Sequence, residues 1–240
     1  MILFVFTIDS DWAINEVIED VSNLFESYEI KSTFFLTNEI DFSILKNHEL
    51  AIHPNFENST NFEEILQKTL NFLPSKKSLG SRSHKLYYNS TLPTIYQKFG
   101  IEYDSNYILF NYEKPLPFYI PHTSILEIPF FFGDDALFDS TNEFEIKNYN
   151  LNDSGVKVFM FHPIHIFLNT RTIDDYYKVK KYYKDFSKLK EFRNTSKKGI
   201  RNIFEDFLKY TKSKKIQTYT MKQVNDYWRK NFPKSTRNQE

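Results

Sequence analysis

Residues 3–13 read LFVFTIDSDWA, an apolar run that changes abruptly to polar residues. The run from Leu3 to Ile8 predicts a strand that is buried on both faces, as in a parallel sheet. Beyond it, apolar side chains recur with i, i+3, i+4 spacing at Ile14, Val17, Ile18, Val21, Leu24 and Phe25. This spacing predicts an amphipathic helix. A buried strand followed by such a helix is the unit from which parallel α/β folds are built.

The same alternation of strand and helix continues along the chain. Further strands are predicted at residues 32–36, 49–52, 78–82, 101–103, 125–128, 156–161 and 216–219, and further helices at 60–73, 93–99, 173–192, 198–213 and 221–230. A capping box from Thr60 to Glu63 starts the first of these helices. Short connections predict a parallel sheet in one domain, either closed into a barrel or open and doubly wound. We assign residues 1–232 to this domain and 233–240 to a frayed end.

Length and composition exclude several classes of protein. The 25 Phe and 16 Tyr among 240 residues provide a large core without disulfides and exclude a disordered chain. The absence of Cys excludes thiolate metal sites and a cysteine nucleophile, so any metal must be bound by His, Asp, Glu or Asn. No apolar run approaches the ~18 residues of a membrane helix, and the opening run lacks the basic lead of a signal peptide. We therefore expect a cytoplasmic protein with no stable membrane insertion.

Charge is unevenly distributed, although the formal net charge is zero. Residues 171–240 contain 20 of the 31 Lys and Arg but only 8 of the 31 Asp and Glu. A basic segment can bind nucleic acid or an anionic membrane. Here the lysines alternate with aromatic residues, as on solvent-exposed helix faces, and the chain has no glycine-rich phosphate loop or zinc-finger spacing. We therefore expect no nucleic-acid partner.

Polar residues stand at or directly after the ends of several predicted strands. Four of the six histidines do so, together with an arginine and two aspartates. Because the carboxyl ends of parallel strands meet on one face, these side chains are expected to lie close together. They are Asp9, Asp11, His53, Arg82, His84, His162 and His165.

Two aspartates separated by one residue can divide the work of a hydrolytic site. One carboxylate can bind a divalent cation while the other acts as general base toward water. A histidine across the site can stabilise the oxyanion and protonate the departing amine. Asp9 or Asp11 could instead cap the helix that starts near Ile14. The histidines at the other strand ends favour the chemical interpretation, and a buried Arg82 would need one of the two carboxylates as its partner.

Several short motifs, in order along the chain, resemble those of the polysaccharide deacetylase superfamily, which has the NodB-homology domain and includes carbohydrate esterase family 4. The resemblance covers residues 3–228 and is greatest to a divergent branch associated with surface-polysaccharide gene clusters. Thr7–Ala13 resembles the family's Thr-Phe-Asp-Asp motif, and Glu49–Phe56 stands where the family has Gly-His-Glu-Ile-Gly-Asn-His. The other matching stretches are Ser32–Leu36, Arg82, Tyr103–Ser105, Phe161–Pro163 and Thr218–Met221.

This resemblance implies a distorted (β/α) barrel of about seven strands and a metal-dependent hydrolase. The implied reaction removes an acetyl group from an N-acetylated sugar of a surface polysaccharide or its precursor. The implied cofactor is a divalent metal ion, zinc in the first place, with cobalt or manganese as alternatives. The family's roles fall on Asp9 (general base), Asp11 and His53 (metal ligands), Arg82 (orienting the base) and His162 (general acid).

The chain departs from the family pattern at its first motif. Ser10 separates the two aspartates, which are adjacent in the family, so the roles of Asp9 and Asp11 as base and ligand could be exchanged. At the late motif, His165 follows His162 by three residues and could share or replace its catalytic role.

The second departure concerns the third metal ligand. Glu57 stands four residues after His53, where the family has its second histidine. We expect His84 to supply the third ligand, because imidazole binds transition metals better than an amide does. Asn55 and Glu57 are the alternatives.

The remaining candidates are interpreted as structural. Asp134 and Asp135 follow an apolar run and are expected in an exposed turn, although they could bind substrate hydroxyls or support Arg82. Trp12 is either a platform for a sugar ring or a core residue. Three further residues are expected to face outward without a function, namely His48, His122 and Glu127.

Two other functions use the same residues. An amidase or deformylase acting on a non-sugar C–N bond would need the same acid, base and metal. A catalytically inactive carbohydrate-binding barrel would account for Ser10 and for the missing histidine. No heptad pattern predicts an oligomeric state.

Overall fold

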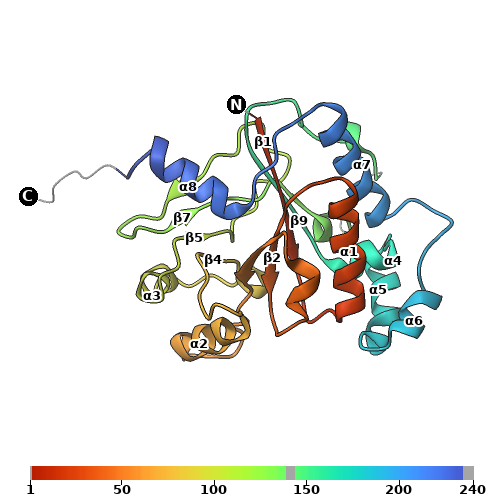
Figure 1. The fold of residues 1–240 in the computed structure, drawn as a ribbon, viewed down its shortest axis with the longest axis horizontal. Helices are drawn as coiled ribbons and strands as arrows, with labels where there is room; N and C mark the ends of the chain where they lie inside the picture. Colours follow the sequence, from red (N-terminus) through yellow and green to blue (C-terminus); the bar gives the residue numbers. More distant parts are fainter. Residues whose placement is uncertain (1, 139–143, 235–240) are drawn as a thin grey trace, which may run out of the picture.

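A curled, mostly parallel sheet forms the centre of the molecule (Figure 1). The computed structural model describes residues 2–138 and 144–234. The strands lie in the order β6-β7-β5-β4-β3-β2-β1-β9-β8, and of their pairings only β6 with β7 is antiparallel. Their bounds are β1 Ile2–Asp9, β2 Thr33–Leu36, β3 Glu49–Ile52, β4 Gly80–Ser81, β5 Tyr103–Asp104, β6 Phe118–Tyr119, β7 Leu126–Glu127, β8 Phe132–Gly133 and β9 Gly155–Phe161.

One extended segment, residues 126–133, supplies strands toward both ends of this order. Its first part is β7, which pairs with β5, and its last part is β8, which pairs with β9. The sheet must therefore curl until β5 and β9 flank the same segment. Counted with β7 and β8 as one, the described residues contribute seven parallel strands to the curled sheet, and the predicted fold class of a distorted (β/α) barrel is confirmed. The antiparallel β6 is an addition that was not predicted.

Helices follow the strands largely as the apolar periodicity predicts. Their bounds are α1 Asn15–Ser27, α2 Phe62–Phe72, α3 Leu92–Lys98, α4 Pro163–Leu168, α5 Ile173–Val179, α6 Phe186–Glu191, α7 Ile200–Ser213 and α8 Met221–Asn231. The prediction of one helix over 173–192 is wrong. The Asp185 side chain accepts a hydrogen bond from the Lys188 backbone and starts α6 as a separate helix. The cap of α2 is also displaced by one residue, because the side chain of Asn61, not Thr60, accepts from the Glu64 backbone.

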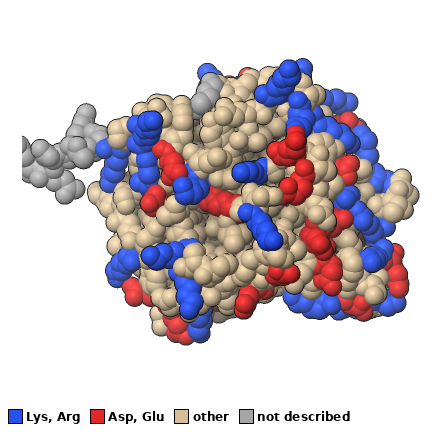
Figure 2. All heavy atoms as spheres, in the orientation of Figure 1, with Lys and Arg blue, Asp and Glu red and all other residues tan. Residues whose placement is uncertain are grey.

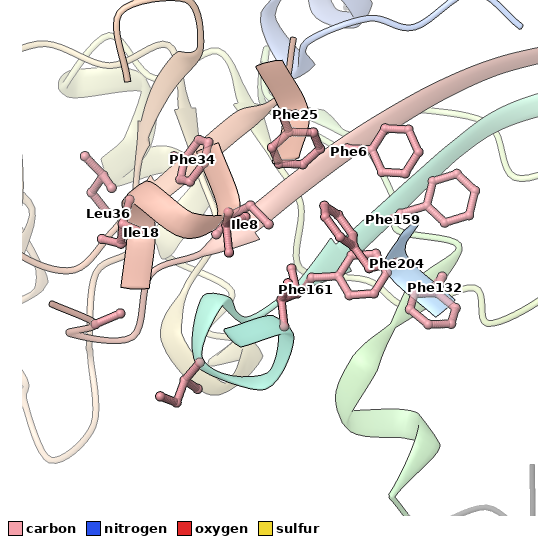
Figure 3. Close-up of a cluster of buried hydrophobic side chains, with 14 of the residues drawn as sticks. Phe6, Ile8, Ile18, Phe25, Phe34, Leu36, Phe132, Phe159, Phe161 and Phe204 are labelled. Atoms are coloured by element: carbon pink, nitrogen blue, oxygen red, sulfur yellow. The ribbon is translucent and has the colours of Figure 1, made fainter. Parts of the chain in front are cut away.

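Aromatic side chains fill the space between the sheet and the helices that cover its outer face (Figure 3). Phe6 of β1 stacks on Phe159 of β9 with ring centroids 5.0 Å apart. Phe25 of α1 meets Phe204 of α7 edge to face at 5.1 Å. Such buried rings contribute most of the apolar area in a core of this kind. This packing fixes α1 and α7 against β1 and β9, the two longest strands.

The inside of the curled sheet has its own apolar core. Leu3 and Val5 point inward from β1, on the opposite face from Phe6. Met221 and Trp228 of α8 pack against this inner cluster. The inner apolar core therefore includes residues of α8. It leaves the polar side chains at the carboxyl ends of the strands available to form a site.

Basic and acidic side chains are intermingled on the face of the molecule seen in Figure 2. Several ion pairs join the basic C-terminal region to the acidic N-terminal region. Arg201 of α7 lies 2.5 Å from Asp20, and Lys212 lies 2.6 Å from Glu29. In the folded protein, these pairs bring part of the excess basic charge of residues 171–240 into contact with the excess acidic charge of the N-terminal region. Within residues 2–138 and 144–234, no helix combines the length and the apolar character that a membrane span requires.

Two residues expected to lie at the surface are in fact enclosed. The His48 ring is buried against Phe25 and Phe34 and accepts a hydrogen bond from the Ser32 backbone at 3.2 Å. Its burial lowers the pKa of His48 to about 4. Glu127 is completely buried as well. His122 is exposed, as predicted, and residues 235–240 of the predicted frayed end lie outside the described residues.

Candidate active site

The carboxyl ends of the strands bring most of the predicted site residues into one cavity of about 330 Å³. The topology explains this convergence, because β1, β3 and β9 all run in the same direction and end at the same mouth of the sheet. Arg82 lies beneath the cavity and is completely buried. The predicted residues that line the cavity are Asp9, Asp11, His53, His84 and His162.

Three side chains present ligand atoms to a common point. Oδ1 of Asp11 lies 3.1 Å from Nε2 of His53 and 3.2 Å from Nδ1 of His84. Nδ1 of His53 lies 2.6 Å from the backbone carbonyl oxygen of Arg82. A carbonyl only accepts hydrogen bonds, so Nδ1 of His53 must donate, which leaves the Nε2 lone pair facing the cavity. Two imidazoles and one carboxylate fit the nitrogen and oxygen ligand set of zinc, cobalt or manganese.

The electrostatics of Asp11 follow from this arrangement. Burial would raise its pKa, but the imidazoles of His162, His53 and His84 outweigh that effect and hold the pKa of Asp11 well below its usual range. The carboxyl group is therefore ionised at neutral pH, which is the form that metal binding would require.

Ser10, the inserted residue, is part of the turn that aims both aspartates into the cavity. Its hydroxyl accepts a hydrogen bond from the Thr37 backbone at 3.0 Å and lies 3.1 Å from the Thr37 hydroxyl. Asp11 and Trp12 then adopt the left-handed conformation, with φ of 40° and 58°. Consecutive non-glycine residues in this region are strained and require support from their surroundings.

That support comes from a segment far along the chain. The Tyr183 hydroxyl donates to the Asp11 carbonyl at 2.7 Å, and the Lys184 ammonium donates to the Trp12 carbonyl. Both donors lie between η5 (Lys180–Tyr182) and α6, where the helix predicted over 173–192 is interrupted. The interruption therefore holds the backbone of a candidate metal ligand.

Replacing Tyr183 by phenylalanine should weaken metal binding by ~10-fold, because second-layer contacts that orient a ligand typically contribute 10- to 100-fold to affinity. The lost hydrogen bond should also cost about 1 kcal/mol of stability. Titration with cobalt, followed by its visible absorption, measures the affinity. Tyr177→Phe is the matched control, because Tyr177 is 60% exposed and the same hydroxyl is removed. Equal affinities in the two variants would refute the role of Tyr183.

Asp9 forms a buried ion pair with Arg82. Nη1 of Arg82 lies 2.7 Å from Oδ1 of Asp9 and 2.9 Å from the Thr7 hydroxyl. Nε and Nη2 of Arg82 donate to the carbonyl and hydroxyl oxygens of Ser105, each at 2.9 Å. The Phe35 ring lies 4.4 Å from the guanidinium carbon. A buried charge pair needs such extensive hydrogen bonding, which also fixes the orientation of the Asp9 carboxylate.

His162 is held by Asp134, which was expected in an exposed turn. That expectation is wrong, because Asp134 is completely buried at the start of η3 (Asp134–Leu137). Its Oδ1 lies 2.8 Å from Nδ1 of His162, and its Oδ2 accepts from the His162 backbone at 2.8 Å. Nε2 of His162 points into the cavity, 3.6 Å from Oδ2 of Asp11. Two Asp residues after an apolar strand were the only sequence signal for this pair.

The charges around His162 and Asp134 reflect this contact. Burial disfavours the His162 cation, but Asp135, Asp134 and Asp11 outweigh it and raise the pKa of His162 well above its usual value. Burial also raises the pKa of Asp134, to about 6, against the opposing effect of His162. The imidazole accordingly carries a proton that it can donate from Nε2.

His165 is buried beside His162 but belongs to a different set of contacts. Its Nδ1 lies 3.2 Å from the Thr170 hydroxyl, and its Nε2 lies 3.7 Å from Oδ1 of Asp135. Burial and the nearby His162 hold the pKa of His165 well below its usual value. His165 lines a neighbouring cavity of about 630 Å³ together with Trp12 and Tyr176.

The alternatives to His84 as a metal ligand are engaged elsewhere. Glu57 forms an ion pair with Lys85 at 2.7 Å, and Oδ1 of Asn55 accepts from the Glu57 backbone at 3.0 Å. Neither belongs to the group formed by Asp11, His53 and His84. Trp12 is 37% exposed, so it is a wall of the neighbouring cavity and not a core residue.

A family model for WbmS-like polysaccharide deacetylases matches residues 6–180, which include every candidate catalytic and metal-binding residue described above. The chain belongs to this family. The match ends before Tyr183 and Lys184, so the support of the Asp11 turn lies outside the segment that the family model covers.

The fold of this chain is similar to two solved structures that are named as polysaccharide deacetylases. One from Bordetella bronchiseptica, named as a polysaccharide deacetylase involved in O-antigen biosynthesis, is 26% identical with a TM-score of 0.75, and the match covers 87% of this chain and 90% of the other. One from Mycobacterium smegmatis is 14% identical with a TM-score of 0.58, covers 99% of this chain and 94% of the other, and supports the fold alone. No curated protein sequence matches the chain.

Proposed function

We propose that the protein is a metal-dependent hydrolase that removes the acetyl group from an N-acetylated sugar of a surface polysaccharide or its precursor. Membership of the deacetylase family and the similarity to the Bordetella protein support the reaction and the substrate class. The observation that carries the proposal is the placement of Asp9 and His162 beside the group formed by Asp11, His53 and His84.

Each ligand atom of the proposed metal site comes from a different strand end. Oδ1 of Asp11, Nε2 of His53 and Nδ1 of His84 would hold the cation. When bound, a divalent ion supplies Lewis acidity that activates water and polarises the acetyl carbonyl. Zinc is the proposed ion, since two imidazoles and a carboxylate are among its preferred ligands.

Asp9 and His162 carry out the proton transfers. Asp9, held by Arg82, accepts a proton from the attacking water as the water oxygen forms a bond to the acetyl carbon. His162 donates its Nε2 proton to the amide nitrogen as the C–N bond breaks, and its Nδ1 proton stays on the ring, where it is donated in a hydrogen bond to Asp134. Acetate and the free amino sugar leave. The proton on Asp9 then returns to solvent, and His162 is reprotonated.

The test is acetate release by the purified protein supplied with zinc, cobalt or manganese. Acetamido sugars should yield acetate and a stoichiometric metal ion should be recovered with the protein, while Asp11→Ala should lose both. Hydrolysis of simple linear amides alone would replace the proposal with an amidase. A metal-free protein that binds sugar without releasing acetate would replace it with a binding module.

A further inference from the structure

Two carboxyl groups are buried side by side next to the site, although neither lines the catalytic cavity. Asp104 ends β5 and Glu127 ends β7, and the two are register partners in parallel strands. Asp104 is 4% exposed and Glu127 is 0% exposed. Because neighbouring strands lie ~4.8 Å apart and register partners point to the same face, the two carboxyl groups are within reach of each other.

Each carboxyl group uses one oxygen and leaves the other unused. Oδ2 of Asp104 accepts from the Asn106 side chain at 3.0 Å, and Oε1 of Glu127 accepts from the backbones of Asn106 and Tyr107 at 3.0 and 3.1 Å. Oδ1 of Asp104 and Oε2 of Glu127 are buried with no hydrogen-bond partner in the part of the chain that the structure describes. Unpaired buried acceptors are costly.

One proton placed between the two groups removes this cost. A protonated carboxyl oxygen donates, so each of the unused oxygens gains a partner and the pair keeps one negative charge instead of two. Arg82 does not satisfy them instead, because four of its five N–H donors bind Thr7, Asp9 and Ser105, and neither unused oxygen accepts a hydrogen bond from the fifth.

The pair is connected to the proposed metal site through Asn106. Oδ1 of Asn106 accepts from the Ser83 backbone at 2.9 Å, and its amide donates to the Ser83 hydroxyl at 3.1 Å. Ser83 directly precedes His84, and its backbone carbonyl accepts from the Leu86 backbone at 2.9 Å at the start of the short η2 helix (His84–Leu86) on which His84 lies. Asn106 therefore joins the two carboxyl groups to the backbone that carries His84.

We propose that Asp104 and Glu127 share one proton at neutral pH and act together as positioning residues for His84. The shared proton holds Asn106 in the orientation that fixes Ser83. The positioning role rests on the proposed function, because that function assigns His84 to the metal. The shared proton itself does not depend on the proposed function.

The surroundings of the pair set its response to pH. The groups that face it are Arg82 from the end of β4, Tyr96 from α3 and Tyr107 from the segment after β5. Burial raises the pKa of Asp104 to about 7, and burial together with Asp104 raises that of Glu127 well above its usual value. Because the pKa values of the pair are higher in the folded protein than in the unfolded chain, protonation of the pair stabilises the folded state. This stabilisation is complete below the ordinary carboxyl pKa of about 4, and it is lost as the pH rises through the folded-state pKa values.

Glu127→Gln tests the shared proton. The glutamine oxygen can still accept from the two backbone amides, and its NH₂ group replaces the shared proton as a donor to Asp104. Between pH 6 and 8 the folded wild type should hold one proton that the unfolded chain lacks. Its unfolding equilibrium constant should therefore increase with pH by up to an additional factor of about ten per pH unit compared with that of the variant. Urea unfolding of the metal-free protein at several pH values measures this difference. Equal slopes would overturn the shared proton.

Cobalt binding tests the positioning role. Glu127→Ala should weaken cobalt affinity by ~10-fold or more, and Glu127→Gln should restore it. Glu49→Ala is the matched control, because Glu49 is a carboxyl with a raised pKa that contacts Tyr103 and not Asn106. If Glu127→Ala does not fold, two properties of Glu127→Gln still test the proposal. They are the pH dependence of its unfolding constant and its cobalt affinity, which should equal that of the wild type. An unchanged affinity in a folded Glu127→Ala overturns the positioning role, whereas a wild type that binds no cobalt refutes the proposed function and leaves the unfolding test intact.

Discussion

Asp9→Asn is expected to lower kcat by about 10³-fold while leaving the bound metal in place. General base catalysis contributes ~10²- to 10⁴-fold in enzymes, and asparagine cannot accept the proton from water. Its side-chain oxygen can still accept from Arg82, which now donates to Oδ1 of Asp9 at 2.7 Å, so the buried contact is retained in part. Metal analysis and steady-state acetate release on the same preparation give the two quantities.

Asp11→Asn is the control that separates the two aspartates. Asp11 contacts both His53 and His84, whereas Asp9 approaches only His53, at 4.0 Å. Loss of metal in Asp11→Asn but not in Asp9→Asn would confirm the roles proposed for them. The opposite result would exchange base and ligand, an alternative that the Asp-Ser-Asp spacing leaves open.

The convergence of the site was predictable because it follows from topology. Parallel strands end at one mouth of the sheet, so a polar residue after each apolar run is placed there by strand direction alone. Asp11, His53 and His162 come together for this reason. The curling of the sheet followed from the family resemblance, because apolar periodicity cannot distinguish a closed sheet from an open one.

Other features depend on contacts that periodicity does not encode. Tyr183 supports Asp11 from 172 residues away, and nothing in the local sequence distinguishes it from neighbouring tyrosines. Glu127 alternates away from the inner core, as its strand position predicts, but the molecule covers that face as well. Asp134 has the residue type of a turn, and only its burial against His162 reveals a different role.

Asp134→Asn is expected to lower kcat by ~10²- to 10³-fold. Asp134 provides two acceptors to His162, one for the ring Nδ1 proton and one for the backbone amide. Asparagine provides one acceptor and one donor, so one of these protons loses its partner, and the negative charge that stabilises the protonated ring is removed. An imidazole with the wrong proton arrangement cannot serve as the acid. Acetate release at saturating substrate measures the effect, with thermal unfolding to verify the fold.

A comparison of kcat between variants of Asp134, His162 and His165 shows which histidine is the general acid. If His162 acts through Asp134, then Asp134→Asn added to His162→Gln should reduce kcat little further, because residues that act as a unit are not additive. His165→Gln should reduce kcat less than tenfold, because His165 contacts Thr170 and Asp135 and does not line the catalytic cavity. A larger loss in His165→Gln than in His162→Gln would instead transfer the proton donation to His165. Asp134 would then act only to hold the loop.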